Sequence, residues 1–162
     1  MIWSGKRTAA FVRQPPEIKI NPNGVDLKVS EVYEIHNQTV SVLNGKVRTT
    51  NPEKVSIKPD AEGFYNLEQG NVYEARLANE VSVPENAVGL MFPRSSLNRL
   101  GAVKSNTAIW EPGYKGFGTL TIFVPIKLFR IHKDEHWFQF TLQDCEKSDV
   151  LYDGHWQGEK AK

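Results

Sequence analysis

The residues best suited to chemistry lie close together, between positions 92 and 116 of the chain. Residues 93–101 have the sequence PRSSLNRLG, and residues 111–116, EPGYKG, place one carboxylate in a Pro-Gly turn with a tyrosine after it. Arginine forks and serine hydroxyls bind phosphate oxygens, and a positioned carboxylate can take a proton from water. The stretch therefore predicts a polyphosphate site with a base or sugar held beside it.

The phosphate-binding part of this prediction rests on Arg94, Ser95, Ser96 and Arg99. We expect a short helix over residues 95–100, capped by Ser95 or Ser96 and ended by Gly101. A helix start leaves backbone N–H groups unpaired and favours anions, and Arg99 would share a helical face with Ser95. The alternative is a capped surface helix with two solvated arginines.

Composition limits the other possibilities. The 162 residues are 40% hydrophobic and 24% charged with a net charge of +1, which predicts one globular domain over residues 1–162. The balanced charge argues against nucleic acid and membrane surfaces as partners. No apolar run has the ~20 residues of a membrane span, and no signal peptide is apparent, so we expect a cytoplasmic protein.

The surrounding pattern is mostly of the strand kind. Residues 40–42, 54–57, 72–75, 81–83 and 120–123 alternate with period two and are separated by turn signals such as Asn44-Gly45 and Gln69-Gly70. Many short strands predict an all-β fold, a sandwich, jelly roll or barrel. One or two short helices are expected, near residues 6–12 and 95–100, and residues 150–162 form a polar tail that could order over a ligand.

Four segments, in order, resemble the motifs of the dUTPase and dCTP deaminase superfamily. They are NPNGVDLKV (residues 21–29), PRSSLNRLG (93–101), EPGYKG (111–116) and GHWQG (154–158). The resemblance implies a distorted β-barrel or jelly roll that assembles as a homotrimer with active sites between subunits. It also implies a deoxynucleoside triphosphate substrate, dUTP or dCTP, accompanied by Mg²⁺. A triphosphate carries about four negative charges, so a metal held mostly by phosphate oxygens and water is chemically reasonable.

The resemblance implies one of two reactions. In dUTPases a carboxylate in the Pro-Gly turn activates water, and Glu111 has that position here with a side chain one methylene longer than the usual aspartate. In dCTP deaminases a glutamate ten residues later moves protons, and that position holds Thr121, whose hydroxyl is too weak an acid and base. Since no carboxylate occurs between Gly116 and Leu128, deamination by that route is disfavoured.

The same resemblance gives roles to residues around the base and sugar. Tyr114 would lie under the deoxyribose and exclude a 2′-hydroxyl, or would simply pack in the core. Trp110 would shape the base pocket or pack at the trimer axis. Backbone groups near the base would come from the neighbourhoods of Ala108, Thr119 and Thr121.

Further roles concern the phosphates and the metal. Asp26 is expected to be structural or an outer-sphere Mg²⁺ contact, with no direct protein ligand for the metal. Gln139 would lie near the phosphates or be an inward polar residue satisfied by backbone. In the tail, Tyr152, His155 and Gln157 would close near the γ-phosphate, unless the terminus is disordered. The remaining histidines lack metal-ligand spacing, so no zinc site is expected: His36, His132 and His136.

Three functions follow from these residues. The first is a dUTP diphosphatase that releases dUMP and pyrophosphate, with Glu111 activating water. The second is a dCTP deaminase or a bifunctional enzyme, because residues 21–29 and the tail resemble that branch. The third is a nucleotide-binding relative with impaired catalysis, suggested by the unusual residues Glu111, Trp110 and His155.

Overall fold

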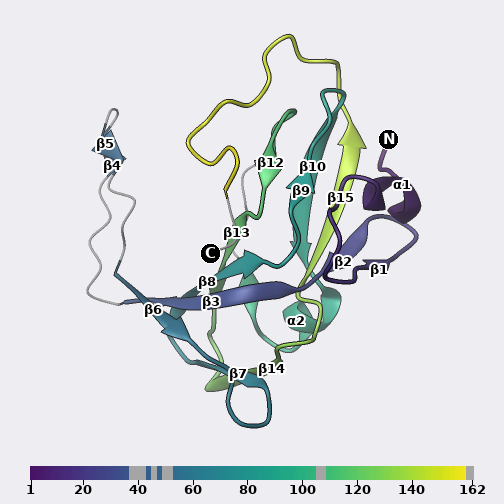
Figure 1. The fold of residues 1–162 in the computed structure, drawn as a ribbon. Helices are drawn as coiled ribbons and strands as arrows, with labels where there is room; N and C mark the ends of the chain where they lie inside the picture. Colours follow the sequence, from purple (N-terminus) through teal and green to yellow (C-terminus); the bar gives the residue numbers. More distant parts are fainter. Residues whose placement is uncertain (37–42, 45–46, 49–52, 105–108, 160–162) are drawn as a thin grey trace.

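The computed structural model describes residues 1–36, 43–44, 47–48, 53–104 and 109–159 (Figure 1). Its helices are α1 (Gly5–Ala9) and α2 (Ser95–Arg99), neither long enough to span a membrane within the described part of the chain. The strands are β1 (Lys19–Ile20), β2 (Val25–Leu27), β3 (Val29–Ile35), β4 (Leu43–Asn44), β5 (Val47–Arg48), β6 (Lys54–Ile57), β7 (Phe64–Glu68), β8 (Val72–Leu77), β9 (Val81–Ser82), β10 (Ala87–Pro93), β11 (Val103–Lys104), β12 (Lys115–Gly116), β13 (Thr119–Phe123), β14 (Leu128–His132) and β15 (Phe138–Asp144).

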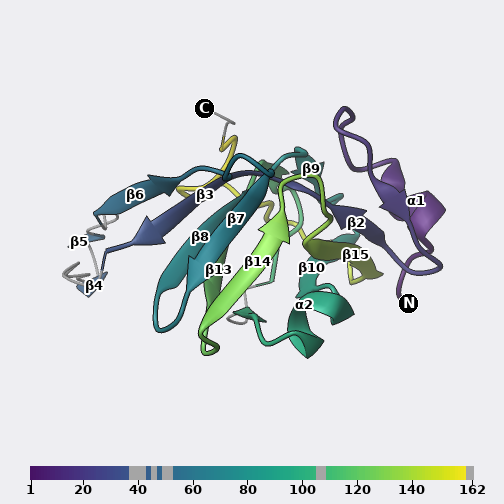
Figure 2. The same ribbon diagram turned by 90° about the horizontal axis from the view of Figure 1, so that it is seen from below.

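The strands form antiparallel sheets that do not close on themselves among the described residues. One sheet has the order β1-β2-β15-β10, and a second has the order β11-β13-β8-β3-β6. Two-stranded ribbons pair β12 with β9, β14 with β7, and β4 with β5. Figure 2 shows α1 beside β1 and β2 on one flank, with β6 on the opposite flank. The prediction of an all-β chain with two short helices is confirmed, and its sheets are open.

Period-two alternation explains why these segments are strands. On β13 Leu120 and Ile122 are buried while Thr119 and Thr121 are half-buried, and β8 alternates in the same way. The buried faces of both sheets contribute to one hydrophobic cluster, which includes Trp137, Phe138 and Phe140. The outward face of β13 and β8 is mostly polar, whereas that of β10 carries Val88, Leu90 and Phe92.

The predicted elements are present with shifted ends. The strand expected at 54–57 is β6, those at 72–75 and 120–123 lie within β8 and β13, and that at 81–83 ends one residue early. The strand expected at 40–42 lies outside the described residues. The first helix begins and ends earlier than expected, at Gly5–Ala9, because Ser4 caps it by accepting a hydrogen bond from the Arg7 amide at 3.3 Å.

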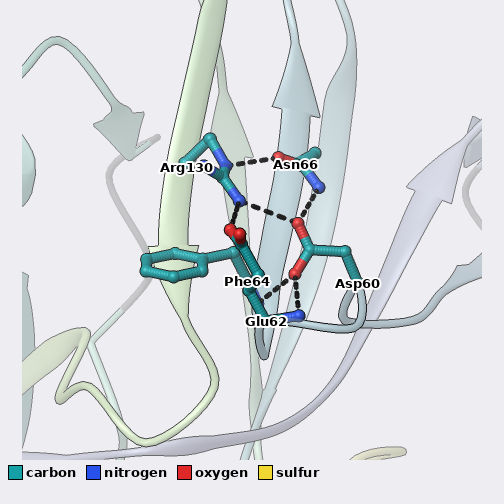
Figure 3. A network of polar contacts seen from close by, with 5 residues as sticks. All are labelled: Asp60, Glu62, Phe64, Asn66 and Arg130. Carbon is teal, nitrogen blue, oxygen red and sulfur yellow. Dashed lines mark hydrogen bonds and ion pairs between the residues drawn. The ribbon is translucent and has the colours of Figure 1, made fainter.

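A polar network fixes the β7–β14 ribbon on the molecule's surface (Figure 3). The Asp60 carboxylate accepts hydrogen bonds from the Phe64 amide at 2.9 Å, the Asn66 side chain at 2.9 Å and the Arg130 guanidinium at 2.9 Å. The guanidinium also lies 4.5 Å from the centre of the Phe64 ring. The Asn66 and Phe64 donors, together with Arg130, hold the pKa of Asp60 well below its usual range. This network is structural and separate from the predicted site residues.

Candidate functional site

Arg94 is the centre of one cluster of predicted site residues. It follows directly after β10 and is the N-cap residue of α2. Its Nε donates to the Asp26 carboxylate at 2.9 Å, and its Nη1 donates to Glu135 at 2.6 Å and to the His136 carbonyl at 3.0 Å. Glu135 was not predicted as a site residue, because it lies in the turn between β14 and β15, 41 residues away from Arg94 in the chain.

Asp26 reaches Arg94 because β2 pairs with β15. In this register Asp26 lies opposite Gln139, and the Asn21 side-chain amide donates to the Asp26 carboxylate at 2.6 Å. The Gln139 amide donates to the Asn23 carbonyl at 2.6 Å. Asp26 is 4% exposed, so its charge depends on Arg94 and Asn21 for compensation. Asp26 thus makes a direct ion pair with Arg94. Gln139 lies opposite Asp26, and its side chain is bonded to a backbone carbonyl.

Ser95, Ser96 and Arg99 are exposed on α2. The expected serine cap is wrong, because Arg94 occupies the N-cap position and makes no side-chain cap bond among the described residues. The helix has five residues, little more than one turn, so its dipole adds little to anion binding. The groups that α2 and its N-cap offer to an anion are therefore mainly the serine hydroxyls and the two arginine side chains.

Glu111 is the centre of a second cluster, at the turn before β12. The Tyr114 amide donates to the Glu111 carbonyl at 3.0 Å, and Gly113 has a φ of +88°, a conformation that favours glycine. The Glu111 side chain is exposed and makes no hydrogen bond or ion pair with any other described residue. The Pro-Gly turn thus presents to solvent a carboxylate whose oxygens have no partner among the described residues.

Aromatic residues fill the space behind this turn. Tyr114 is 8% exposed, and its ring makes edge contacts with Trp110 at 5.0 Å and Tyr152 at 5.7 Å between centroids. The Gly118 amide donates to the Tyr114 hydroxyl at 3.2 Å. Burial raises the pKa of Tyr114 to about 12. The indole of Trp110 covers Gly118 so closely that a Cβ there would lie 2.3 Å from it.

The C-terminal tail lies against the same turn. The Tyr152 amide donates to the Pro112 carbonyl at 2.8 Å. The Gln157 side chain accepts from the Lys115 amide at 2.9 Å and donates to the Gly113 carbonyl at 2.8 Å. Figure 1 shows the tail alongside β12 and well away from α2. Tyr152 and Gln157 are therefore brought to Glu111, and not to Arg94 of the same chain.

His155 and Glu159 complete the described tail. His155 is exposed and stacks edge-on with Trp156 at 4.7 Å between centroids. Glu159 lies 3.5 Å from the Arg76 guanidinium, and burial raises the pKa of the Glu159 carboxyl. The tail residues thus cover the polar face of β8 as well as the turn.

Thr119 and Thr121 lie on this polar face of β13. Thr119 is opposite Arg76 and Thr121 is opposite Glu74 on β8. Glu74 is ion-paired with Lys54 at 2.6 Å. The register therefore brings a carboxylate beside Thr121 from the neighbouring strand, which counting along the chain did not reveal. Ala108 lies outside the described residues.

The two clusters lie apart within one chain. The Trp110 backbone pairs with Gly89 in the middle of β10, and Arg94 follows five residues after Gly89. At about 3.3 Å per residue, this separation is about 16 Å. Within one chain, the Arg94 backbone is thus remote from the Trp110 backbone, which directly precedes Glu111.

Comparisons with known proteins agree with the motifs. Residues 4–145 match the family model described as dCTP deaminase-like. A deoxyuridine 5′-triphosphate nucleotidohydrolase of Methanocaldococcus jannaschii is 27% identical over 98% of this chain and 99% of its own length. A probable enzyme of the same name from Aeropyrum pernix is 34% identical over 86% of each chain.

The fold has a solved relative as well. The crystal structure of 2′-deoxycytidine 5′-triphosphate deaminase from Agrobacterium tumefaciens superposes with a TM-score of 0.67 at 17% identity. The superposition covers 87% of this chain but 46% of that one, so this chain spans about half its length. The resemblance inferred from the four motifs is confirmed, and the chain belongs to the dCTP deaminase-like family of the dUTPase and dCTP deaminase superfamily.

Proposed function

We propose that this protein is a dUTP diphosphatase that hydrolyses dUTP to dUMP and pyrophosphate. The observation that carries the proposal is Glu111 in the Pro-Gly turn that leads to the buried Tyr114. Its carboxylate is exposed and has no partner among the residues that the structure describes. The similarity to archaeal deoxyuridine triphosphate nucleotidohydrolases over nearly the whole chain supports the same substrate. We expect the enzyme to work in the cytoplasm.

The proposed reaction follows from these groups. Glu111 orients a water molecule and accepts its proton as the water oxygen bonds to the α-phosphorus. The bond from that phosphorus to the α,β-bridging oxygen breaks, and pyrophosphate leaves with the electron pair. Arg94, Ser95, Ser96 and Arg99 would hold the phosphates, and Tyr114 and Trp110 would shape the sugar and base pocket.

The described residues fit a metal carried by the substrate better than a metal held by the protein. Both Asp26 oxygens already have partners, Arg94 and Asn21, whereas Glu111 is open to an outer-sphere contact. No group of three or more potential ligand side chains occurs among the described residues. A bound Mg²⁺ would neutralise phosphate charge, and Glu111 would offer it an outer-sphere contact through water.

We also propose a homotrimer in which each site combines two copies of the chain. The separation of about 16 Å between Arg94 and the Trp110 backbone supports this arrangement. One copy would supply the Arg94 cluster and a neighbour would supply Glu111, Tyr114 and the tail. Tyr152, His155 and Gln157 could then lie near phosphates bound by the other copy.

The test is product analysis with dUTP and Mg²⁺ by liquid chromatography. Wild-type protein should form dUMP, and Glu111→Gln should lower kcat by about 10²–10⁴ while it still binds dUTP. Glu68→Gln, which changes an exposed glutamate on β7, is the matched control and should keep full activity. Wild-type protein that binds dUTP without forming dUMP would exclude the proposal.

A second candidate, dCTP deamination, is favoured by Glu74. This carboxylate lies opposite Thr121 in the β8–β13 register and could move protons as water adds to cytosine and ammonia leaves. Its ion pair with Lys54 opposes this role, because Lys54 already occupies the carboxylate that would have to reach the substrate. Ammonia released from dCTP by wild-type protein, and lost in Glu74→Gln, would establish this activity.

A further inference from the structure

Arg94 is shared between two carboxylates of unequal burial. Its Nε contacts Asp26 at 2.9 Å, and its Nη1 contacts Glu135 at 2.6 Å. The Asp26 side chain is 5% exposed and the Glu135 side chain is 51% exposed. One guanidinium thus has a buried anion on its Nε and a solvent-accessible anion on its Nη1.

Separating Asp26 from Arg94 would cost a large amount of free energy. Asp26 lies within β2, opposite Gln139 of β15, and separating it from Arg94 would leave a buried charge with Asn21 as its remaining partner. Asp26 therefore fixes the orientation of the guanidinium from one side. Asp26 is thus a positioning residue for Arg94.

Glu135 can leave at much lower cost. It lies in the exposed turn between β14 and β15, where water can replace Arg94 as its partner. Burial alone would raise the pKa of Glu135, but hydrogen bonds from the His136 amide and from Arg94 outweigh that effect and lower the pKa. Glu135 is therefore an anion at neutral pH and a competitor for any other anion at Nη1.

We propose that Glu135 is a displaceable counter-anion that occupies on Arg94 the position of a substrate phosphate oxygen. The proposal rests on the function proposed above, in which Arg94 binds the triphosphate. A phosphate group offers several oxygens to the planar guanidinium and carries more charge than one carboxylate, so it can displace Glu135. Asp26 keeps the guanidinium aligned while this exchange takes place.

The exchange would make the site selective for highly charged ligands. A triphosphate with its metal can displace Glu135, whereas an anion of lower charge competes less well with a carboxylate that is already in place. After cleavage, the return of Glu135 to Arg94 would favour product release. Charge, and not the base alone, would then decide which nucleotides stay bound.

The test compares two neighbouring carboxylates by isothermal titration calorimetry. Glu135→Gln and Glu135→Ala remove the competitor, and Asp134→Asn removes one charge from the adjacent residue, which contacts His132 and not Arg94. The probes are inorganic tripolyphosphate and dUTP with an imido group between the α- and β-phosphorus, each with Mg²⁺. Circular dichroism and thermal melting confirm that each variant folds.

Both Glu135 variants should bind each probe at least about threefold more tightly than Asp134→Asn does. Equal affinities would overturn the proposal, and weaker binding by the Glu135 variants would make Glu135 a support for Arg94. Absence of tripolyphosphate binding in wild-type protein and Glu135→Ala alike would also overturn it. A protein that forms no dUMP but shows the tightening with tripolyphosphate would contradict the proposed hydrolysis alone.

Discussion

At the scale of single residues, Tyr114 combines a buried ring with a hydroxyl that has a structural partner. The sequence suggested either a sugar contact or a core aromatic, and the ring is in fact packed between Trp110 and Tyr152. Its hydroxyl accepts a hydrogen bond from the Gly118 amide. The hydroxyl therefore helps to fix the backbone between β12 and β13. Burial favours the neutral phenol of Tyr114 in the folded chain, so the stability of the protein should change with pH where tyrosine ionises.

We expect stability to fall as pH rises from 10 to 12 on account of Tyr114. The pKa is about 12 in the folded protein against 10.0 in the unfolded chain, so the unfolded state loses its proton first and gains stability. The full loss is at most about 2.5 kcal/mol. Urea unfolding of wild type and Tyr114→Phe at pH 8, 10, 11 and 12 gives the free energy of unfolding of each protein. The contribution of Tyr114 is the difference between the two proteins in the slope of this free energy against pH.

Tyr114→Phe should itself be less stable at pH 8. Without the hydroxyl, the buried Gly118 amide loses its acceptor, at a cost of about 1–3 kcal/mol. Parallel pH slopes for the two proteins above pH 10 would show that Tyr114 does not ionise with a raised pKa.

The contact between Gly118 and Trp110 gives a second prediction at this scale. A Cβ at Gly118 would overlap the indole, so Gly118→Ala should destabilise the fold by about 1–3 kcal/mol. The penalty should shrink in a Trp110→Leu background, because the smaller side chain leaves room for the methyl group. Urea unfolding of the four proteins gives the coupling, and an equal penalty in both backgrounds would contradict the contact.

At the scale of elements, the tail covers an otherwise open strand edge. One edge of β12 pairs with β9, and the other edge is occupied by Gln157, Gly158 and Glu159. The Gly158 amide donates to the Lys115 carbonyl at 2.8 Å, and the Phe117 amide donates to the Glu159 carbonyl at 3.0 Å. An open edge offers unpaired backbone groups, so the tail protects the turn that carries Glu111.

Gln157→Ala should loosen this arrangement without unfolding the sheets. Its carboxamide joins the Lys115 amide to the Gly113 carbonyl, so we expect amide hydrogen exchange at Lys115 to accelerate at least about tenfold. Exchange in β10 and β15 should stay unchanged. Gln143→Ala, at an exposed position of β15, is the control, and equal exchange at Lys115 in both variants would contradict the role of Gln157.

The sequence predicted some elements better than others. Alternation identified β6, β8 and β13 because one face of each is polar or partly exposed. It did not identify β10, since Gly89 and Pro93 interrupt its pattern. The strand β15 was also missed, although Phe138, Phe140 and Leu142 alternate with polar residues. These two strands nevertheless pair along their whole length, from Ala87 opposite Asp144 to Pro93 opposite Phe138.

At the scale of the whole molecule, the predicted site residues form two clusters. Arg94 with Asp26 and Gln139 forms one, and Glu111 with Tyr114, Tyr152 and Gln157 forms the other. Along β10, about 16 Å separates the Arg94 backbone from the Trp110 backbone, which directly precedes Glu111. This separation supports our proposal that each site combines two copies of the chain.

Mixed assemblies of two inactive variants test this directly. Arg94→Ala and Glu111→Gln should each be inactive alone, but their random co-assembly should restore about a quarter of wild-type dUTP hydrolysis, because each cluster of a shared site is intact half the time. Co-expression with two affinity tags allows purification of the mixed trimers, in which about one site in three has both clusters intact, so their activity should be about a third of wild type. The double variant Arg94→Ala/Glu111→Gln is the control, and mixed assemblies no more active than this control would mean that each site lies within one chain.

The sequence by itself determined the local features of this protein. The alternation of β8 and β13, the short helix after Arg94 and the turn at Gly113 depend on nearby residues and on backbone conformations that few residue types adopt. The four motifs, in order, also determined the family. Each of these signals is contained in a few consecutive positions.

Only the tertiary structure decided which groups meet. Strand register brought Glu74 to Thr121 and Asp26 to Gln139, and a distant turn brought Glu135 to Arg94. Alternation shows which side chains of a strand share a face. It does not show which strand lies beside it or in what register the two strands pair, because both depend on packing of the whole chain. For the same reason, the stretch from 92 to 116 appeared to be one site, and the fold divided it between the two ends of a path about 16 Å long.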